Sequence, residues 1–147
     1  LVMAASQPFA WILTVEGIPQ YLSELIISWE LSPIMFLIAV NVLLLLFGIF
    51  MEPLPGIMIL VPILAPIANA LGIDPIQFAM VVVVNLTLGM ITPPVGGLLF
   101  VTCVATKTTL SELNKELPLF LLAQFVVLML LTFIPALSTW LPHALGF

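Results

Sequence analysis

The segment Gly89-Met90-Ile91-Thr92-Pro93-Pro94-Val95-Gly96-Gly97 decides how this chain folds, because it interrupts an otherwise continuous apolar stretch. Residues 78–88 before it and residues 98–105 after it are almost all apolar. The two prolines carry no N–H, and a residue that precedes proline is disfavoured in a helix. Glycines on both sides tolerate backbone conformations that other residues avoid. The pattern predicts one transmembrane helix over 74–105 that is broken near its middle.

Such a break has two interpretations. In hydrocarbon, unpaired backbone groups are costly, so a break is tolerated only where protein covers it or where it lines a wet cavity. Broken helices of this kind build the substrate and ion sites of secondary transporters. A plain loop or kink between two ordinary helices would use the same residues, and the break alone leaves both interpretations open.

The composition is that of an integral membrane protein. Of the 147 residues, 63% are hydrophobic and only 6% are charged, and the mean hydropathy is +1.38. Soluble domains carry about 25% charged residues. The net charge of -5 argues against binding of nucleic acid or of an anionic lipid surface. Because Leu1 begins inside an apolar stretch, we expect the chain to be the C-terminal part of a longer protein.

A second interruption, Glu52-Pro53-Leu54-Pro55-Gly56, separates two apolar arms and predicts a helical hairpin over 31–71. Ser32-Pro33 is typical of a helix start. The first arm, residues 34–51, is apolar apart from Asn41 and long enough to cross the hydrocarbon region. If both arms span, Glu52 lies at a membrane surface. If the hairpin is re-entrant, Glu52 lies at depth, where a charge is costly and usually functional; length does not decide between the two.

The expected fold class is an all-α integral membrane protein. Three further regions complete the chain. Residues 1–30 mix helix breakers with an amphipathic stretch and predict broken or interfacial helices. Residues 106–117 contain both basic residues of the chain, Lys107 and Lys115, and predict a cytoplasmic connector. Residues 118–142 begin at Pro118 and predict a last span.

Polar residues inside the apolar runs either line a solute path or bond across packed helices. Packing is favoured for Asn41, whereas Asn85, one helical turn before Gly89, fits a binding site and packing equally well. His143 is interpreted as a solvated terminal residue. The spans contain no Ser/His/Asp set, no metal-spaced His or Cys cluster and no paired carboxylates, so we expect neither an enzyme nor a bound cofactor.

Together, Phe50-Met51-Glu52-Pro53-Leu54 and the Gly89–Gly96 break resemble the large membrane subunit of TRAP (tripartite ATP-independent periplasmic) transporters, the DctM-like family. Further stretches follow the family pattern: residues 11–14, 18–20, 60–67, 72–75, 133–138 and 140–142. The resemblance covers nearly the whole chain. Members of this family are longer and contain two inverted repeats, so the chain resembles the C-terminal repeat alone.

This resemblance implies an elevator-type secondary transporter, of which the chain would be one inverted-repeat half. It implies uptake of an organic acid, such as a dicarboxylate or sialic acid, across the bacterial inner membrane and driven by a sodium gradient. It also implies two partners, a small membrane subunit and a periplasmic substrate-binding protein. The alternative is a non-transporting structural subunit of a larger membrane complex, which would have no need of two interrupted helices.

On the same resemblance, the tip 51–56 and the break 89–96 meet near the bilayer midplane. Candidate substrate- and ion-binding residues come from both segments. Gly17, in the helix-breaking stretch at residues 16–19, is a weaker candidate. The candidates are Glu52, Pro53, Gly56, Asn85, Gly89, Thr92, Pro93, Pro94, Gly96 and Gly17. A sodium ion needs several oxygen ligands and carboxylates are scarce here, so backbone carbonyls of Gly89, Thr92 and the tip residue Gly56, with the Thr92 hydroxyl, are the expected ligands.

Overall fold

The computed structural model describes residues 8, 11–12, 15–17, 21, 24, 32–93 and 96–146, and the helices formed there confirm the all-α fold class. The predicted broken or interfacial helices over 1–30 lie mostly outside the described residues. The helices are α3 (Pro33–Phe50), α4 (Pro53–Ala70), α5 (Pro75–Met90), α6 (Gly97–Thr106), α7 (Leu110–Phe133) and α8 (Ala136–Ala144). By length and composition, α3, α4 and α7 could cross a membrane.

The helix starts follow local capping chemistry. The Ser32 side chain accepts a hydrogen bond from the Met35 amide at 3.3 Å, and Asp74 accepts one from the Ile76 amide at 2.8 Å. Proline occupies the first turn of α3, α4 and α5, where its missing N–H costs nothing. Only Met51 and Glu52 separate α3 from α4. The helical hairpin is confirmed, but its interruption is shorter than the predicted 52–56, because residues 53–56 already form the first turn of α4.

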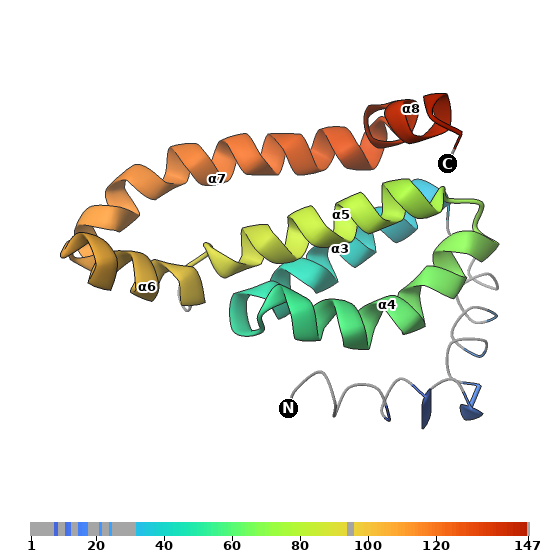
Figure 1. Cartoon of the computed structure of the whole chain (residues 1–147), viewed down its shortest axis with the longest axis horizontal. Helices are drawn as coiled ribbons and strands as arrows, with labels where there is room; N and C mark the ends of the chain where they lie inside the picture. Colours follow the sequence, from blue (N-terminus) through green and yellow to red (C-terminus); the bar gives the residue numbers. More distant parts are fainter. Residues whose placement is uncertain are drawn as a thin grey trace.

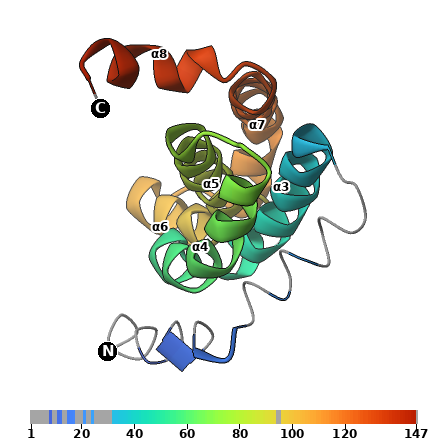
Figure 2. The same ribbon diagram turned by 90° about the vertical axis from the view of Figure 1, so that its right-hand side faces the viewer.

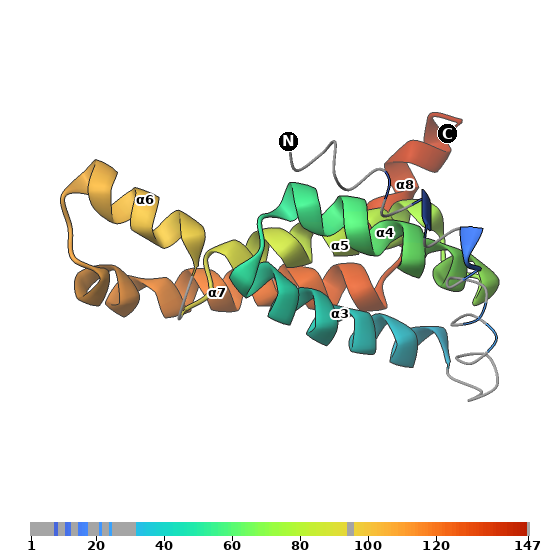
Figure 3. The ribbon, with the colours of Figure 1, turned by 90° about the horizontal axis from the view of Figure 1, so that it is seen from below.

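Helix α5 is the centre of the bundle. It runs parallel to α3, antiparallel to α4 and antiparallel to α7, as Figures 1 and 2 show. The main apolar core lies where α3, α4 and α5 meet and includes Leu44, Ile67, Val82 and Leu86, each 1% exposed or less. A smaller cluster of Val81, Leu128 and Leu131 joins α5 to α7. The packing places the hairpin tip and the end of α5 at the same end of the three-helix unit (Figure 3).

The predicted helix break is confirmed. Helix α5 ends at Met90 and α6 begins at Gly97, with Pro94 and Val95 outside the described residues. Gly96 enters α6 at φ 33°, in the left-handed region, and a methyl group there would lie 2.8 Å from Cδ1 of Leu99. A glycine is needed at this position for its backbone conformation and for space.

The predicted boundaries of the last two regions are wrong. Helix α7 begins at Leu110, so most of 106–117 is helical and Pro118 lies inside the helix. A capping box starts it: the Thr109 side chain accepts from the Glu112 amide, and Glu112 Oε2 accepts from the Thr109 amide at 3.0 Å. Residues 118–142 are not one helix either, because α7 ends at Phe133 and α8 follows Pro135. The cytoplasmic location of the lysines stays a prediction.

Candidate functional site

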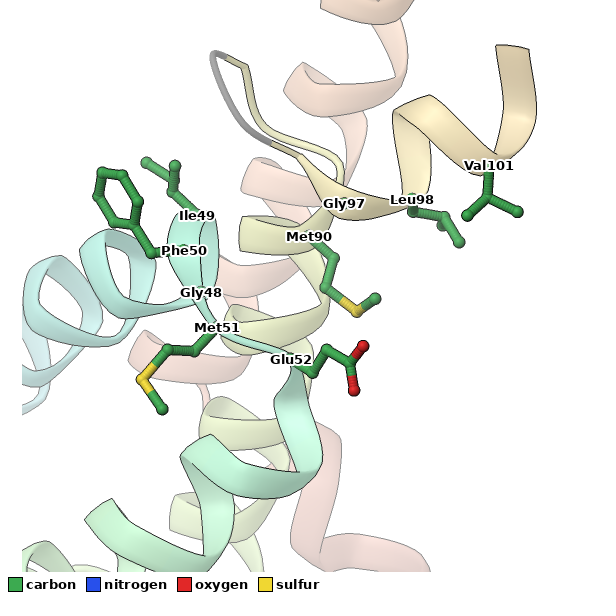
Figure 4. Close-up of a pocket in the computed structure, with 9 residues that line it drawn as sticks. All are labelled: Gly48, Ile49, Phe50, Met51, Glu52, Met90, Gly97, Leu98 and Val101. Atoms are coloured by element: carbon green, nitrogen blue, oxygen red, sulfur yellow. The ribbon is translucent and has the colours of Figure 1, made fainter. Parts of the chain in front are cut away.

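The hairpin tip and the helix break line one cavity of about 280 Å³, called here the tip–break cavity. The end of α3 and the tip contribute Gly48, Ile49, Phe50, Met51 and Glu52, and the break side contributes Met90, Gly97, Leu98 and Val101. Figure 4 shows the side chains of Glu52 and Met90 directed into the space between the tip and α6. The two interruptions that the sequence predicted to meet are therefore neighbours.

Four helix ends surround this cavity. Helices α3 and α5 end at it, and α4 and α6 begin at it. A helix N-terminus presents free N–H groups and a partial positive charge, whereas a C-terminus presents free carbonyls and a partial negative charge. The start of α6 therefore favours an anion and the ends of α3 and α5 favour a cation, as in transporters with discontinuous helices. The start of α4 offers fewer donors, because Pro53 and Pro55 have no N–H.

Glu52 carries the only ionisable side chain in the lining of the tip–break cavity. It is the N-cap residue of α4, it is exposed, and its side chain makes no capping bond. The described residues offer its carboxylate no hydrogen bond and no ion pair. Both lysines lie elsewhere, Lys107 after α6 and Lys115 within α7. The carboxylate is thus available to a solute or an ion.

Backbone oxygens gather at the end of α5. Because Pro93 has no N–H, the Gly89 carbonyl loses its helical donor and accepts instead from the Thr92 amide at 3.0 Å. The Thr92 hydroxyl donates to the Leu88 carbonyl at 2.7 Å, which leaves its oxygen lone pairs free. The Met90 carbonyl would pair with residue 94 in a continuous helix, and that residue is proline. This end of α5 is rich in acceptors and poor in donors.

Several predicted site residues lie beside the cavity or away from it. Pro53, Thr92, Pro93 and Gly96 flank the lining residues in sequence, and Pro94 is outside the described residues. Gly56 lies inside α4, where a methyl group would be 3.2 Å from Cδ1 of Leu86. Gly17 occupies a turn at φ 67° and is not part of the lining.

Of the lining residues, the sequence named only Glu52 as a site residue. It missed Gly48, Ile49, Phe50, Met51, Met90, Gly97, Leu98 and Val101. Met90 and Gly97 lie in the break itself, so their position in the sequence could have identified them as lining residues. Gly48, Leu98 and Val101 are apolar residues among apolar residues, so no sequence pattern marks them out.

Asn85 belongs to a second polar region, the amide cluster, formed by Asn41, Gln77, Asn85 and Thr132. The Asn85 side-chain nitrogen donates to the Asn41 carbonyl at 3.0 Å and to Asn41 Oδ1 at 2.7 Å. Asn41 in turn donates to the Thr132 hydroxyl at 2.9 Å. Asn85 is 0% exposed, and its Oδ1 has no hydrogen-bond partner within the part of the chain that the structure describes. These contacts confirm the packing role of Asn41. They also pack Asn85 against α3, while a role of Asn85 in a binding site stays a prediction.

Gln77 extends the amide cluster to the end of α7. Its side-chain nitrogen donates to the carbonyls of Leu131 at 3.1 Å and Thr132 at 3.0 Å. All four cluster residues are buried. The cluster therefore joins α3, α5 and α7 by hydrogen bonds, in addition to the apolar packing between these helices.

An all-helical chain with apolar helices of membrane length, in which two interruptions meet at one cavity, has the architecture of a membrane transporter permease. The family comparison agrees: the model of the "Tripartite ATP-independent periplasmic transporter, DctM component" family matches residues 1–137. The chain belongs to this family. Its members are transporter permeases and not enzymes.

Three relatives illustrate the family. A putative dicarboxylate transporter subunit from Paracoccus pantotrophus is 55% identical over 97% of this chain and 68% of its own length. The C4-dicarboxylate TRAP transporter large permease protein DctM of Pseudomonas aeruginosa is 46% identical over 99% of this chain and 34% of its own length. The sialic acid TRAP transporter large permease protein SiaM of Vibrio cholerae is 35% identical over 92% of this chain and 32% of its own length. The chain thus spans about a third of the named large permeases.

Proposed function

We propose that this chain supplies part of the solute and ion path of a TRAP permease that takes up an organic acid. The observation that carries the proposal is the meeting of four helix ends at the tip–break cavity. A C4-dicarboxylate is the first candidate, because relatives named for dicarboxylates are 55% and 46% identical and the sialic acid relative is 35% identical.

The charges around the cavity favour coupling to a cation. An organic acid placed near the N-termini of α4 and α6 would lie close to the Glu52 carboxylate. Two like unit charges about 4 Å apart repel by about 4 kcal/mol at an effective dielectric constant of about 20. No basic side chain lines the cavity to offset this repulsion. A cation bound between the organic acid and the Glu52 carboxylate would remove it. The acid and the cation therefore bind better together than apart.

We propose sodium as that cation. Sodium prefers oxygen ligands. The candidates are the Glu52 carboxylate and the Met90 carbonyl, which belong to lining residues, and the Gly89 carbonyl and Thr92 hydroxyl beside Met90 in the chain. Gly56, expected as a ligand from the sequence, packs against Leu86 away from the lining, so it is left out of this proposal.

The proposal extends to the setting of the permease. The chain would lie in a bacterial inner membrane as a multi-pass protein, beside a small membrane subunit, and would receive its acid from a periplasmic binding protein. The tip would be re-entrant, which is supported by its place beside the break, with α6 and part of α7 extending past it (Figure 1).

The test uses the complete permease with its partner subunits, reconstituted into liposomes. Glu52→Gln removes the charge and keeps the shape, and Glu116→Gln, on an exposed position of α7, is the matched control. Sodium-driven dicarboxylate uptake should fall at least tenfold in Glu52→Gln, together with its sodium activation. Uptake equal to that of the control would contradict the proposal and favour a non-transporting structural role.

A further inference from the structure

Two glycines, Gly48 on α3 and Gly89 on α5, bring the two helix backbones into direct contact. A methyl group added at Gly89 would lie 2.5 Å from both Cα and the carbonyl carbon of Gly48. One added at Gly48 would lie 3.1 Å from Gly89 Cα and from the Leu86 carbonyl oxygen. Both glycines are buried, and the obstructing atoms are backbone atoms that cannot rotate away. This approach therefore requires glycine at position 89, whereas an alanine at position 48 would need its backbone neighbours to shift by a few tenths of an ångström.

The contact lies at the cavity end of the α3–α5 interface. Gly48 lines the tip–break cavity about one helical turn before Glu52, and Gly89 directly precedes the lining residue Met90. Farther from the cavity, the same interface is held by the Asn41–Asn85 hydrogen bonds. The glycine contact therefore joins α3 and α5 close to where the chain turns at the tip and at the break.

We propose that Gly48 and Gly89 are positioning residues, whose contact sets how closely the hairpin tip approaches the helix break. Packed helices are normally about 8–10 Å apart, and glycine pairs let membrane helices come closer. The contact thereby fixes the separation between Glu52 and the oxygen-rich end of α5. The consequence for transport rests on the proposed function of the cavity.

Single methyl groups should act in a graded way. Non-bonded carbon atoms settle at about 3.5–4.0 Å, so Gly89→Ala must move the two helices apart by about 1 Å. Gly48→Ala meets its obstacles at 3.1 Å and needs a smaller shift. Gly97→Ala places the same methyl group on the same cavity with no atom of the described residues within 4 Å, which makes it the matched control.

Cross-linking in the complete permease measures the separation directly. Cysteines are introduced by Met51→Cys and Met90→Cys after Cys103→Ser, and reagents of increasing length are compared. We expect Gly89→Ala to lower the yield with the shortest effective reagent at least threefold and to favour longer reagents, Gly48→Ala to fall between, and Gly97→Ala to match the parent. If Gly89→Ala does not fold, the intermediate result for Gly48→Ala decides. Equal length profiles in all variants would overturn the inference.

Uptake in the same variants separates the positioning role from the function of the cavity. The apparent KM for the dicarboxylate should rise about tenfold in Gly89→Ala, less in Gly48→Ala and least in Gly97→Ala. A changed cross-linking profile with unchanged uptake would keep the positioning role and overturn the proposed function. A fall in uptake with an unchanged profile would overturn the positioning role.

Discussion

The amide cluster and the tip–break cavity are both polar regions inside an apolar chain, and they differ in how their polar groups are satisfied. In the cluster, side-chain nitrogens of Asn41, Gln77 and Asn85 all donate within the protein, and the residues are buried. In the cavity, Glu52 has no partner among the described residues and is exposed. One cluster atom, Asn85 Oδ1, is also unpaired among the described residues, but it is buried, whereas the Glu52 carboxylate is both unpaired and exposed at the cavity and is therefore available to solutes.

The strongest test of this difference adds a charge to the amide cluster. Asn85→Asp would bury a carboxylate with no cation near it, at a cost of about 3 kcal/mol in a membrane-spanning segment. The free energy of unfolding of the complete permease in a denaturing-detergent titration should fall by about that amount. Glu52→Asp, which keeps a charge at the exposed cavity, should leave it almost unchanged. Equal losses of unfolding free energy in the two variants would contradict the difference between the buried amide cluster and the exposed cavity.

A smaller effect is expected where the cluster loses one hydrogen bond without gaining a charge. Thr132→Val keeps the shape and removes the hydroxyl that accepts from Asn41 at 2.9 Å. Membrane hydrogen bonds contribute about 0.6 kcal/mol on average, and this buried one should cost about 1 kcal/mol. The same titration measures the loss, and uptake per folded permease should remain within about twofold of the parent. A tenfold loss of uptake would instead link the cluster to the solute path.

The smallest effect is expected at the far end of α5. His143 Nε2 on α8 lies 3.2 Å from Asp74 Oδ2, with His143 53% exposed, so the residue is not simply solvated as the sequence suggested. Exposed ion pairs contribute about 0–1 kcal/mol. His143→Ala should therefore change the free energy of unfolding by less than about 1 kcal/mol, and a larger loss would show that α8 anchors the bundle.

Local signals predicted much of the fold. Prolines and glycines marked the tip and the break, and Ser32 capped a helix where expected. The start of α7 was missed because the charges around Thr109 and Glu112 suggested a loop, although the same residues form a capping box. Asn85 and Gly48 could not be placed from sequence, because a buried amide or a backbone contact depends on which helix lies opposite.

Solute protection tests most directly whether the tip–break cavity receives ligand. Leu98 lines the cavity and Val104, on the same helix α6, does not. With Cys103→Ser in the complete permease, Leu98→Cys and Val104→Cys are labelled with a water-soluble maleimide. Sodium and dicarboxylate together should slow labelling at position 98 several-fold and leave position 104 unchanged. Unchanged labelling at 98, or equal slowing at both positions, would contradict a ligand in this cavity.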